Sequence, residues 1–401
     1  SYDKESGELV LHNYMDFDNL KDYVKISYEL TQDGLLIGKG KLAEVSVAPH
    51  SEGKTNLQVN VPENGKCYLK LTYHLKKEMP LLEEDYILGF DEIEVSQKDA
   101  KCQLAEKWVE KTVTDSELQV SEDDTQIHIK GREFAYTIDR RTALFTEMKF
   151  AGREYLNHPM ELNIWRAPTD NDMYIKSEWK KAHYDKAYTR AYTTEVVQGK
   201  HGVKITSHAS VVAETVQKIL DVTITWKIEA AGKIDADIAV TKDDEFPDLP
   251  RFGVRMFLDK KLSAARYFGM GPQESYCDKH QAASHGLYQA NVDDLHEDYI
   301  RPQENGSHYD CEYVELNNSR YGIVASAEKA FSFNASYYTQ EELEKKTHNY
   351  ELTESDSVVF CVDYALNGIG SNSCGPVVLE QYRFDDVLFR FQFTLIPYIK
   401  G

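Results

Sequence analysis

Residues 163–172, which read NIWRAPTDND, place an indole and a guanidinium directly before a proline and a cluster of polar side chains. Asp170, Asn171 and Asp172 favour turns over strands, and Pro168 fixes the backbone before them, so we expect a loop with a rigid start. This loop could be an acid-rich turn that caps a helix. It could also be a polar rim beside an aromatic side chain, as sugar sites often have. The residues alone leave both interpretations open.

The carboxylates of this loop are weak evidence for catalysis. Glycoside hydrolysis needs two carboxylates held over one sugar, and a chain with 67 acidic residues forms carboxylate pairs by chance. Asp170 and Asp172 lie two apart on an irregular turn, which does not aim both at one bond, so we expect a structural or rim role. An EF-hand loop needs ligands at alternate positions, a central glycine and a terminal glutamate. This segment lacks that pattern, and we predict no metal site here.

Other catalytic motifs are absent from the sequence: there is no GxSxG, no P-loop, no GxGxxG and no HExxH. Two glycine-rich stretches remain. In residues 269–272 (GMGP), Pro272 lacks the N–H that a phosphate would need, so we expect a tight turn. In residues 368–376 (GIGSNSCGP), the small residues allow the backbone to approach another loop or a ligand closely. Packing is the commoner reason for such a stretch.

Composition limits the classes of partner. The 401 residues are 41% hydrophobic, carry a formal net charge of −21 and have a pI near 5.1. This charge repels nucleic acid and anionic membranes, and no run of 18 apolar residues could span a bilayer. The six dispersed cysteines favour free thiols. The first residues lack a basic start and an apolar core, so we expect a part of a longer chain. The compartment, bacterial cytoplasm or periplasm, stays open.

Hydrophobic residues alternate with a period of two along most of the chain, which predicts antiparallel strands with one buried face. The pattern is clear in 222–228 and 234–240, and again in 387–395, where Val387 begins an apolar row. Residues 25–30 and 35–42 flank an Asp-Gly turn and predict a hairpin. Residues 69–75 predict a further strand. We therefore expect an all-β fold.

The strands divide into two groups. We expect a small immunoglobulin-like β-sandwich over 1–95, a polar connecting segment over 96–124 and a large antiparallel β-sandwich over 125–401. Helices are predicted only over 178–187 and after the capping box at Thr339, over 340–346. No alternation of strands and helices occurs, so this chain contains no TIM barrel.

Four motifs occur in an order that resembles the C-terminal region of the large β-galactosidases of glycoside hydrolase family 2. They are WRAPTDND (165–172), FGMGPQESYCDKHQAASHG (268–286), YIRPQENGSHYD (299–310) and NGIGSNSCGP (367–376). The resemblance covers about Gln126 to the end, and the first 95 residues resemble the immunoglobulin-like domain that precedes this region. It implies a supersandwich of the galactose-mutarotase type for the second part. The motif residues with an expected structural role are Trp165, Arg166, Pro168, Gly271, Pro272, Gln273, Glu274, Glu304, Asn305 and Gly306.

The resemblance also implies a function. In the family, a central TIM barrel carries the catalytic glutamates, magnesium and sodium or potassium, so we expect no catalytic residue and no cofactor in this chain. Its expected partners are galactosides and the barrel and N-terminal domains of the same enzyme, with a homo-oligomer left open. Two loops are expected to reach the sugar site, a mobile loop over 173–178 and the loop 368–376. The expected substrate-binding residues are Asp170, Asn171, Asp172, Asn372 and Cys374.

Cys374 departs from the family pattern, because well-known members carry a tryptophan there that stacks on the sugar. The expected function is thus the non-catalytic part of a retaining β-galactosidase, inactive alone. One alternative is a free-standing carbohydrate-binding β-sandwich protein, which would need an exposed aromatic platform, and another is an adhesion module. The chain offers few tryptophans for such a platform: Trp108, Trp165, Trp179 and Trp226.

Overall fold

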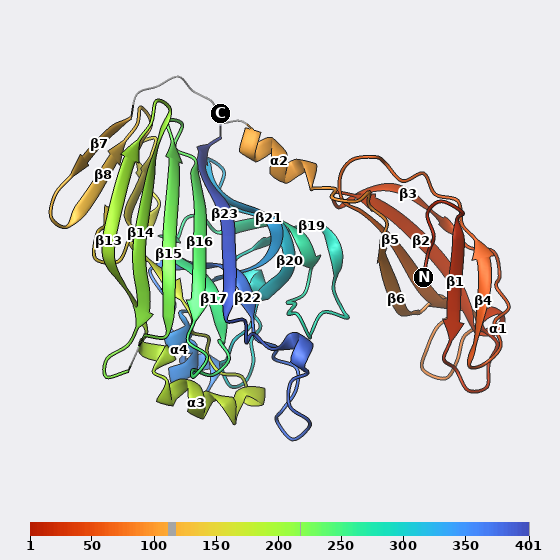
Figure 1. The fold of residues 1–401 in the computed structure, drawn as a ribbon. Coiled ribbons are helices and arrows are strands. Elements are labelled where there is room, and N and C mark those ends of the chain that lie inside the picture. The colour runs from red at the N-terminus through yellow and green to blue at the C-terminus, as the bar shows by residue number, and fades with distance from the viewer. Residues whose placement is uncertain (111–117, 217, 401) are drawn as a thin grey trace. The chain divides into compact units, whose positions relative to one another are not determined.

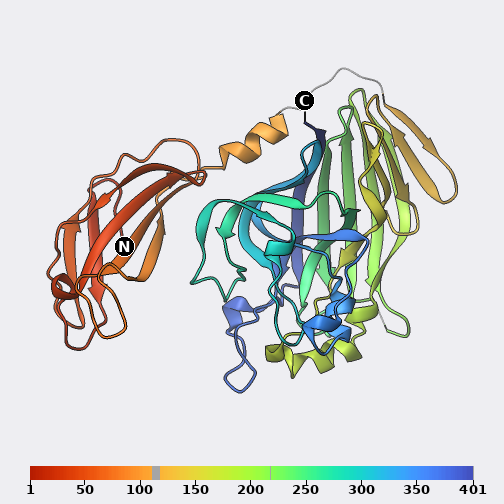
Figure 2. The same cartoon turned by 180° about the vertical axis from the view of Figure 1, so that it is seen from behind.

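The computed structural model describes residues 1–110, 118–216 and 218–400, without the side chains of 106 and 108–110. The chain splits into two compact units. The first comprises Ser1–Glu106 with His285–Leu287, and the second comprises Lys107–Ser284 with Tyr288–Gly401. Figure 1 draws both units as ribbons, and Figure 2 shows them from behind.

The first unit is a small β-sandwich. Its two sheets have the strand orders β1-β4 and β3-β2-β5-β6. Leu9 and Leu11 on β1 and Leu69 and Leu71 on β5 are buried between them, because each strand turns alternate side chains inward. The elements are β1 (Glu8–Asn13), α1 (Leu20–Tyr23), β2 (Val24–Gln32), β3 (Leu35–Lys41), β4 (Ser51–Asn56), β5 (Cys67–Leu75) and β6 (Ile87–Glu94).

The predicted hairpin is confirmed, since β2 and β3 pair antiparallel across Asp33 and Gly34. Both turn residues have positive φ, 49° and 77°, as a tight two-residue hairpin turn requires. The strand predicted over 69–75 is confirmed as part of β5.

The second unit is a large antiparallel sandwich of a five-stranded and a twelve-stranded sheet. Strands β13 to β16 and β23 run side by side in the larger sheet (Figure 1). The strands are β7 (Gln119–Glu122), β8 (Gln126–Lys130), β9 (Phe134–Asp139), β10 (Leu144–Phe150), β11 (Arg153–Glu154), β12 (Leu156–Asn163), β13 (Tyr188–Gln198), β14 (Gly202–Val212), β15 (Leu220–Glu229), β16 (Ile234–Lys242), β17 (Arg251–Asp259), β18 (Ala264–Gly271), β19 (Ser284–Asn291), β20 (Ser307–Asn317), β21 (Tyr321–Ser336), β22 (Ser357–Leu366) and β23 (Leu388–Ile399).

One hydrophobic core fills this sandwich and receives side chains from both sheets. Trp226 on β15 is fully buried, its ring centroid lies 4.9 Å from that of Phe145 on β10, and its indole N–H donates to the Ala143 carbonyl at 2.8 Å. The alternation read from the sequence is thus confirmed in β15, β16 and β23. Val387 is a correction: it precedes β23 and is exposed, because the strand begins at Leu388. The predicted all-β class is confirmed.

Helix α3 lies at one end of the second unit, as Figures 1 and 2 both show, and the helices that follow α1 are all short. They comprise α2 (Gln103–Glu110), α3 (Ile175–Lys181) and α4 (Gln340–Lys345), with 3-10 turns η1 (Asp170–Asp172), η2 (Tyr184–Lys186), η3 (Asp293–Leu295), η4 (Asn349–Glu351) and η5 (Glu380–Tyr382).

The two predicted helices differ in how well their bounds agree with the structure. The helix expected over 178–187 starts earlier and stops earlier, because buried Trp179 anchors the middle of α3 and His183 adopts a left-handed φ of 57°. The stretch 173–178, expected to be a loop, is therefore helical from Ile175. The helix after Thr339 is confirmed, and the Thr339 hydroxyl accepts from the Glu342 N–H at 3.1 Å.

The predicted connecting segment 96–124 contains α2 and β7, and its residues 111–117 lie outside the described part of the chain. The structural division between the units falls within α2, after Glu106.

Candidate functional site

The first motif contains a buried ion pair that also binds the fourth motif, about two hundred residues later in the sequence. The Arg166 guanidinium donates to both carboxylate oxygens of Asp172, at 3.2 and 2.7 Å. It also donates to the carbonyls of Asn367 and Gly368, the latter at 3.2 Å. Arg166 is fully buried and Asp172 is 3% exposed, so neither charge reaches water. The start of the loop 368–376 is therefore bound to residues 165–172.

Two further side chains hold the same loop, which we call the glycine loop (Gly368–Pro376). The Asn171 amide donates to the Ile369 carbonyl at 2.6 Å. The Asp278 carboxylate accepts from the backbone N–H groups of Ile369, at 3.0 Å, and Gly370, at 2.7 Å. A Cβ at position 368 would lie 2.7 Å from an Asp278 oxygen, which explains the glycine there. The loop root is thus fixed from both sides.

The third motif is joined to the first by backbone contacts. Glu304 N–H donates to the Ala167 carbonyl at 3.0 Å, and Asp170 N–H donates to the Gln303 side-chain oxygen at 3.1 Å. The Asn305 carbonyl accepts from the Asn334 amide of β21 at 2.6 Å. These contacts tie residues 299–310 both to the first motif and to the large sheet.

Glu304 is a buried acid beside a buried cation. Arg251 lies 3.2 Å from one of its oxygens and also forms an ion pair with Asp363, while the other Glu304 oxygen has no hydrogen-bond partner. Burial raises the pKa of Glu304. The side chain is almost fully buried, so its role in the described structure is to join the third motif to Arg251 of β17 in the large sheet.

The second motif completes the network. Glu274 accepts from the Gly306 N–H at 2.8 Å, and Ser275 N–H donates to the Ser307 carbonyl at 2.7 Å. Gly306 has a φ of 70°, which a glycine adopts without strain. Gly271 is buried, whereas Pro272 and Gln273 are exposed. All four motifs therefore meet at one end of the second unit.

Trp165 and its neighbours form the packed side of this network. Its ring meets that of Trp179 edge-on at 6.2 Å, and both rings are buried. Trp226 is buried as well, while the side chain of Trp108 lies outside the described residues. Pro168 is half-buried, directly before the polar turn. The three described tryptophans thus offer no exposed platform for a sugar.

The residues expected to bind substrate differ in exposure. Asp170 and Cys374 are exposed, and Asn171 and Asn372 are partly exposed. Asn372 has a left-handed φ of 89°, and Cys374 carries a free thiol. Asp172 is different, because its carboxylate binds Arg166 and the Thr169 N–H and lies inside the protein. Substrate contact stays a prediction for all five residues.

Asp278 was missed by the sequence analysis, although it lies inside the quoted motif 268–286. The only signal was its place in that motif, three residues after Ser275 and far in sequence from the glycine loop. Nothing in the spacing shows that its carboxylate meets two backbone N–H groups some 90 residues later.

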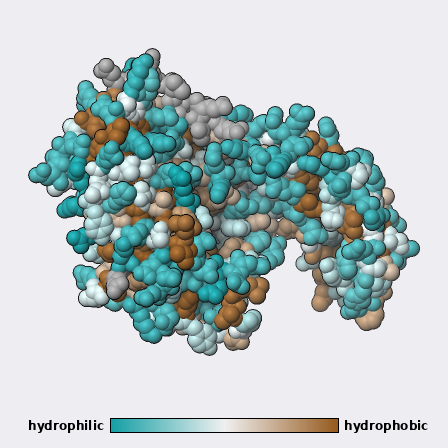
Figure 3. Space-filling view, in the orientation of Figure 1, coloured by the Kyte–Doolittle hydropathy of each residue, from teal (hydrophilic) through white to brown (hydrophobic). Residues whose placement is uncertain are grey.

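Exposed apolar side chains surround the motif network. Met173 and Tyr174 follow the first motif, Val377 and Leu379 follow the glycine loop, and Ile300 opens the third motif. In Figure 3, brown patches interrupt the teal surface at the lower end of the second unit, where Figure 1 shows α3. Singly exposed apolar residues are ordinary, but a group at one end of a domain is typical of an interaction surface.

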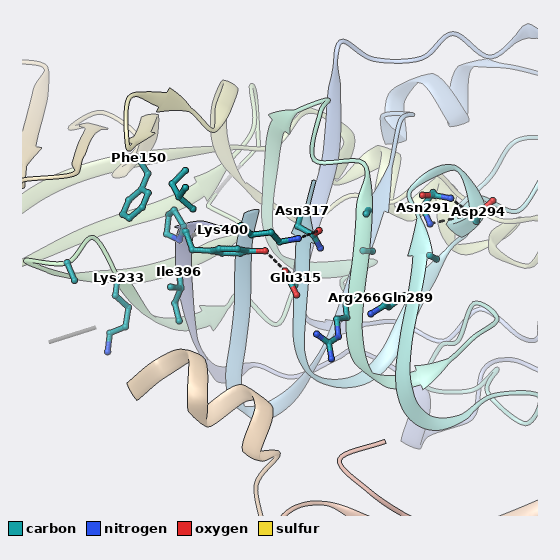
Figure 4. Close-up of a pocket in the computed structure, with 17 residues that line it drawn as sticks. Phe150, Lys233, Arg266, Gln289, Asn291, Asp294, Glu315, Asn317, Ile396 and Lys400 are labelled. Carbon is teal, nitrogen blue, oxygen red and sulfur yellow. Dashed lines mark hydrogen bonds between the residues drawn. The ribbon is translucent and has the colours of Figure 1, made fainter. Parts of the chain in front are cut away.

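A different concavity, of about 950 Å³, lies on the second unit and is shown in Figure 4. Its polar side chains largely bind one another. Lys400 donates to Asn317 at 2.9 Å, and Asn291 donates to Asp294 at 2.9 Å. No residue of the four motifs lines it. It is therefore separate from the motif network.

Within the described residues, no group of three or more His, Cys, Asp and Glu side chains is placed to hold a metal ion. No described helix combines the length and apolar character that a membrane crossing needs.

Comparison with known proteins agrees with the motif order. The family model for the β-galactosidase small chain matches residues 130–395, and the model for β-galactosidase domain 4 matches residues 9–96. The chain belongs to the β-galactosidase small chain family. The recognition made from the four motifs is thus confirmed.

Individual relatives cover nearly the whole chain. A β-galactosidase of Actinobacillus pleuropneumoniae is 41% identical over 97% of this chain, which corresponds to 38% of that protein. A β-galactosidase of Staphylococcus xylosus is 29% identical over 98% of this chain, or 39% of that protein. The chain therefore spans less than two-fifths of the length of these relatives. A solved galactose 1-epimerase of Lactobacillus acidophilus is 8% identical and covers 72% of this chain and 100% of its own, with a TM-score of 0.38. That score is too low to support an argument.

We predict that Arg166→Met destabilises the second unit by about 3–5 kcal/mol, because it leaves the Asp172 carboxylate buried without its cation. The measurement is urea unfolding followed by tryptophan fluorescence. Lys181→Met is the matched control: its ion pair with Glu178 lies in solvent, where water and salt screen it, so its loss should change stability far less. An equal loss of unfolding free energy in both variants would contradict the assignment of Arg166 and Asp172 as a buried ion pair that stabilises the second unit.

We also predict a pH dependence of stability from His308. Its ring is buried against Phe333, and burial lowers its pKa to about 4. The unfolded chain takes up this proton at about pH 6.5. Stability is therefore lost as pH falls from about 6.5 to about 4, by about 3 kcal/mol at most.

The variant His308→Phe isolates this contribution. The free energy of unfolding of both proteins is measured from pH 7 to pH 4. As pH falls, it should decrease more for the wild-type protein than for the variant. Parallel curves would mean that His308 has no depressed pKa.

Proposed function

We propose that this chain is the C-terminal, non-catalytic part of a β-galactosidase that hydrolyses terminal β-D-galactosides such as lactose with retention. In this proposal the two catalytic glutamates, magnesium and sodium or potassium belong to a TIM barrel outside the chain. The chain supplies loops to the sugar site and stabilises the enzyme. Its membership of the small chain family, and the share of the relatives' length that it spans, support this assignment.

The observation that carries the proposal is the clamp on the glycine loop. Arg166, Asn171 and Asp278 fix residues 367–370, yet the following residues Asn372 to Pro376 are partly or fully exposed. A fixed root with an exposed tip suits a loop that must present polar groups to a ligand held by another domain. Such pre-organisation lowers the entropic cost of placing the tip.

The chemistry of the tip fits a supporting role. The Asn372 amide can donate to and accept from sugar hydroxyls. The exposed Asp170 carboxylate can likewise accept hydrogen bonds from sugar hydroxyls. Cys374 offers no aromatic face for the C–H surface of galactose, so we assign affinity from this loop to polar contacts.

The exposed apolar side chains around the network support the proposal that another domain of the enzyme packs against this end of the second unit. Met173, Tyr174, Ile300, Val377 and Leu379 are exposed, and each lies within or a few residues after one of the motifs in the sequence. In the full enzyme we expect the barrel to cover them, as permanent interfaces between domains are rich in apolar contacts. No catalytic step is assigned to this chain.

Turnover of a nitrophenyl β-galactoside tests the proposal. The assay compares this chain, the part of the A. pleuropneumoniae β-galactosidase that it does not match, and their mixture. We expect activity only in the mixture, because the chain alone lacks the catalytic carboxylates. Hydrolysis by the chain alone would show that a catalytic pair lies within its two sandwiches and would refute the proposal.

We further predict that Cys374→Trp, made in the full enzyme, lowers KM for galactosides by roughly three- to tenfold, because an aromatic face adds about 0.5–1.5 kcal/mol of stacking. Cys374→Ser is the control and should leave KM unchanged. If the tryptophan variant alters neither KM nor kcat, the glycine loop does not reach the sugar.

A further inference from the structure

The second unit contains another pocket, of about 410 Å³, that the proposed function does not use. Strands β20 to β23 form one side, and residues 276–277 and 381–384 form the other. Its volume lies within the range of about 300–1,000 Å³ that is usual for small-molecule sites. Tyr276, Cys277, Tyr309 and Asp310 belong to the second and third motifs, so part of these motifs faces this pocket.

Three interruptions of the strand ladders fall at this pocket. In β20, the pairing shifts between His308 and Cys311, which leaves an extra residue at Tyr309 and Asp310. In β21, residues 327–330 are inserted opposite a single residue of β20. In β22, Tyr364 has no partner in the ladder with β17, because the pairs are Phe252 with Ala365 and Gly253 with Asp363. Residues from all three interruptions line the pocket.

Interruptions of this kind weaken a sheet, since the extra residues lose ladder hydrogen bonds. They redirect side chains, and they are enriched next to functional sites. Asp310 adds to this cost, because its φ of 54° is unfavourable for a residue with a Cβ. Random packing would not place three such features around one cavity, so we interpret them as a means of shaping it.

The side chains of the pocket combine aromatic rings with hydrogen-bonding groups. Tyr309, Tyr364 and Phe391 contribute rings, and Asp310 and Asp386 contribute carboxylates. Gln381 and Gln392 add amides that can both donate and accept. Rings that pack against C–H groups, with a few polar groups that fix orientation, are the usual composition of a site for a polar organic ligand.

Three cationic side chains line the pocket, but they do not indicate an anionic ligand. Lys329 is outnumbered there by the carboxylates of Asp310, Glu328 and Asp386. Arg390 forms a bidentate ion pair with Asp237 of β16, and Arg383 forms one with Asp248. Their charges are therefore compensated within the protein. A neutral ligand with many hydroxyl groups can donate to these carboxylates and exchange hydrogen bonds with the amides without bringing a further charge into the pocket.

We propose that this pocket binds a neutral mono- or disaccharide, with Asp310 accepting from its hydroxyls and the partly exposed ring of Tyr364 against its C–H face. It is a second sugar site, distinct from the one that the glycine loop serves. It does not depend on the proposed function, because every group named here belongs to the described second unit.

Titration of the purified chain with lactose, followed by saturation-transfer difference NMR, tests this site. We expect saturable binding, and we expect Asp310→Gly to raise Kd by about tenfold or more, because a hydrogen bond to a charged acceptor is lost. Glycine suits the left-handed backbone at this position, so the variant should fold. Tyr309→Phe, which removes one hydroxyl from the pocket wall, is a second variant and should also raise Kd.

Two control variants establish whether the bound lactose occupies this pocket. Asp99→Gly makes the same change at a similar φ, 61°, outside the pocket and should leave Kd unchanged. Asn372→Gly, which removes the amide that the proposed function assigns to the glycine-loop sugar contact and keeps a residue suited to its φ of 89°, should also leave Kd unchanged, which separates this pocket from the glycine loop. Absence of saturable binding would overturn the proposal, as would a Kd that Asp310→Gly and Tyr309→Phe leave unaltered. Neither result depends on whether the mixed fragments hydrolyse a galactoside.

Discussion

The buried ion pair between Arg166 and Asp172 is the interaction on which the arrangement of the four motifs depends. A guanidinium removed from water requires partners in nearly every direction of its planar fork. Asp172 supplies a bidentate partner, and the carbonyls of Asn367 and Gly368 supply the others. The cost of burying the charge therefore fixes where the glycine loop must begin.

The remaining contacts follow from this constraint. Once residues 367 and 368 lie against Arg166, the next backbone N–H groups meet Asp278, and the Ile369 carbonyl meets Asn171. The second and third motifs then close around the first through short backbone hydrogen bonds. Charged and backbone groups hold the loop root in directional hydrogen bonds, and Ile369 adds an apolar contact in a small cluster with Tyr276 and Leu366. The position of the loop root is therefore specified more closely than apolar packing alone would specify it.

Much of the fold could be predicted from the sequence, because apolar and polar residues that alternate with a period of two indicate a strand with one buried face. Strands β15 and β16 and the hairpin of β2 and β3 were found in this way. The helix after Thr339 followed from its cap. The prediction failed at Val387, where the alternation in the sequence begins one residue before the paired strand β23. It also failed for the bounds of α3, which are set by the burial of Trp179 in the folded protein.

The candidate site was harder to predict, because the contacts that fix the glycine loop join residues about 90 to 200 positions apart. The motif order indicated that 165–172 and 367–376 belong together, but the carboxylate of Asp278 had no local signal. The pocket beside β20 was not foreseen at all, since the bulged residues Asp310 and Tyr364 look like ordinary strand residues in the sequence.

The most direct test of the account is native-state amide hydrogen exchange at Ile369 and Gly370. Both amides donate to Asp278, so we expect them to be protected although they border an exposed loop. Asp278→Ala should speed their exchange by roughly tenfold to a hundredfold, as the loss of a bond to a charged group implies. Exchange in the wild-type protein at the rate of an open loop would contradict the claim that the motif network fixes the glycine loop.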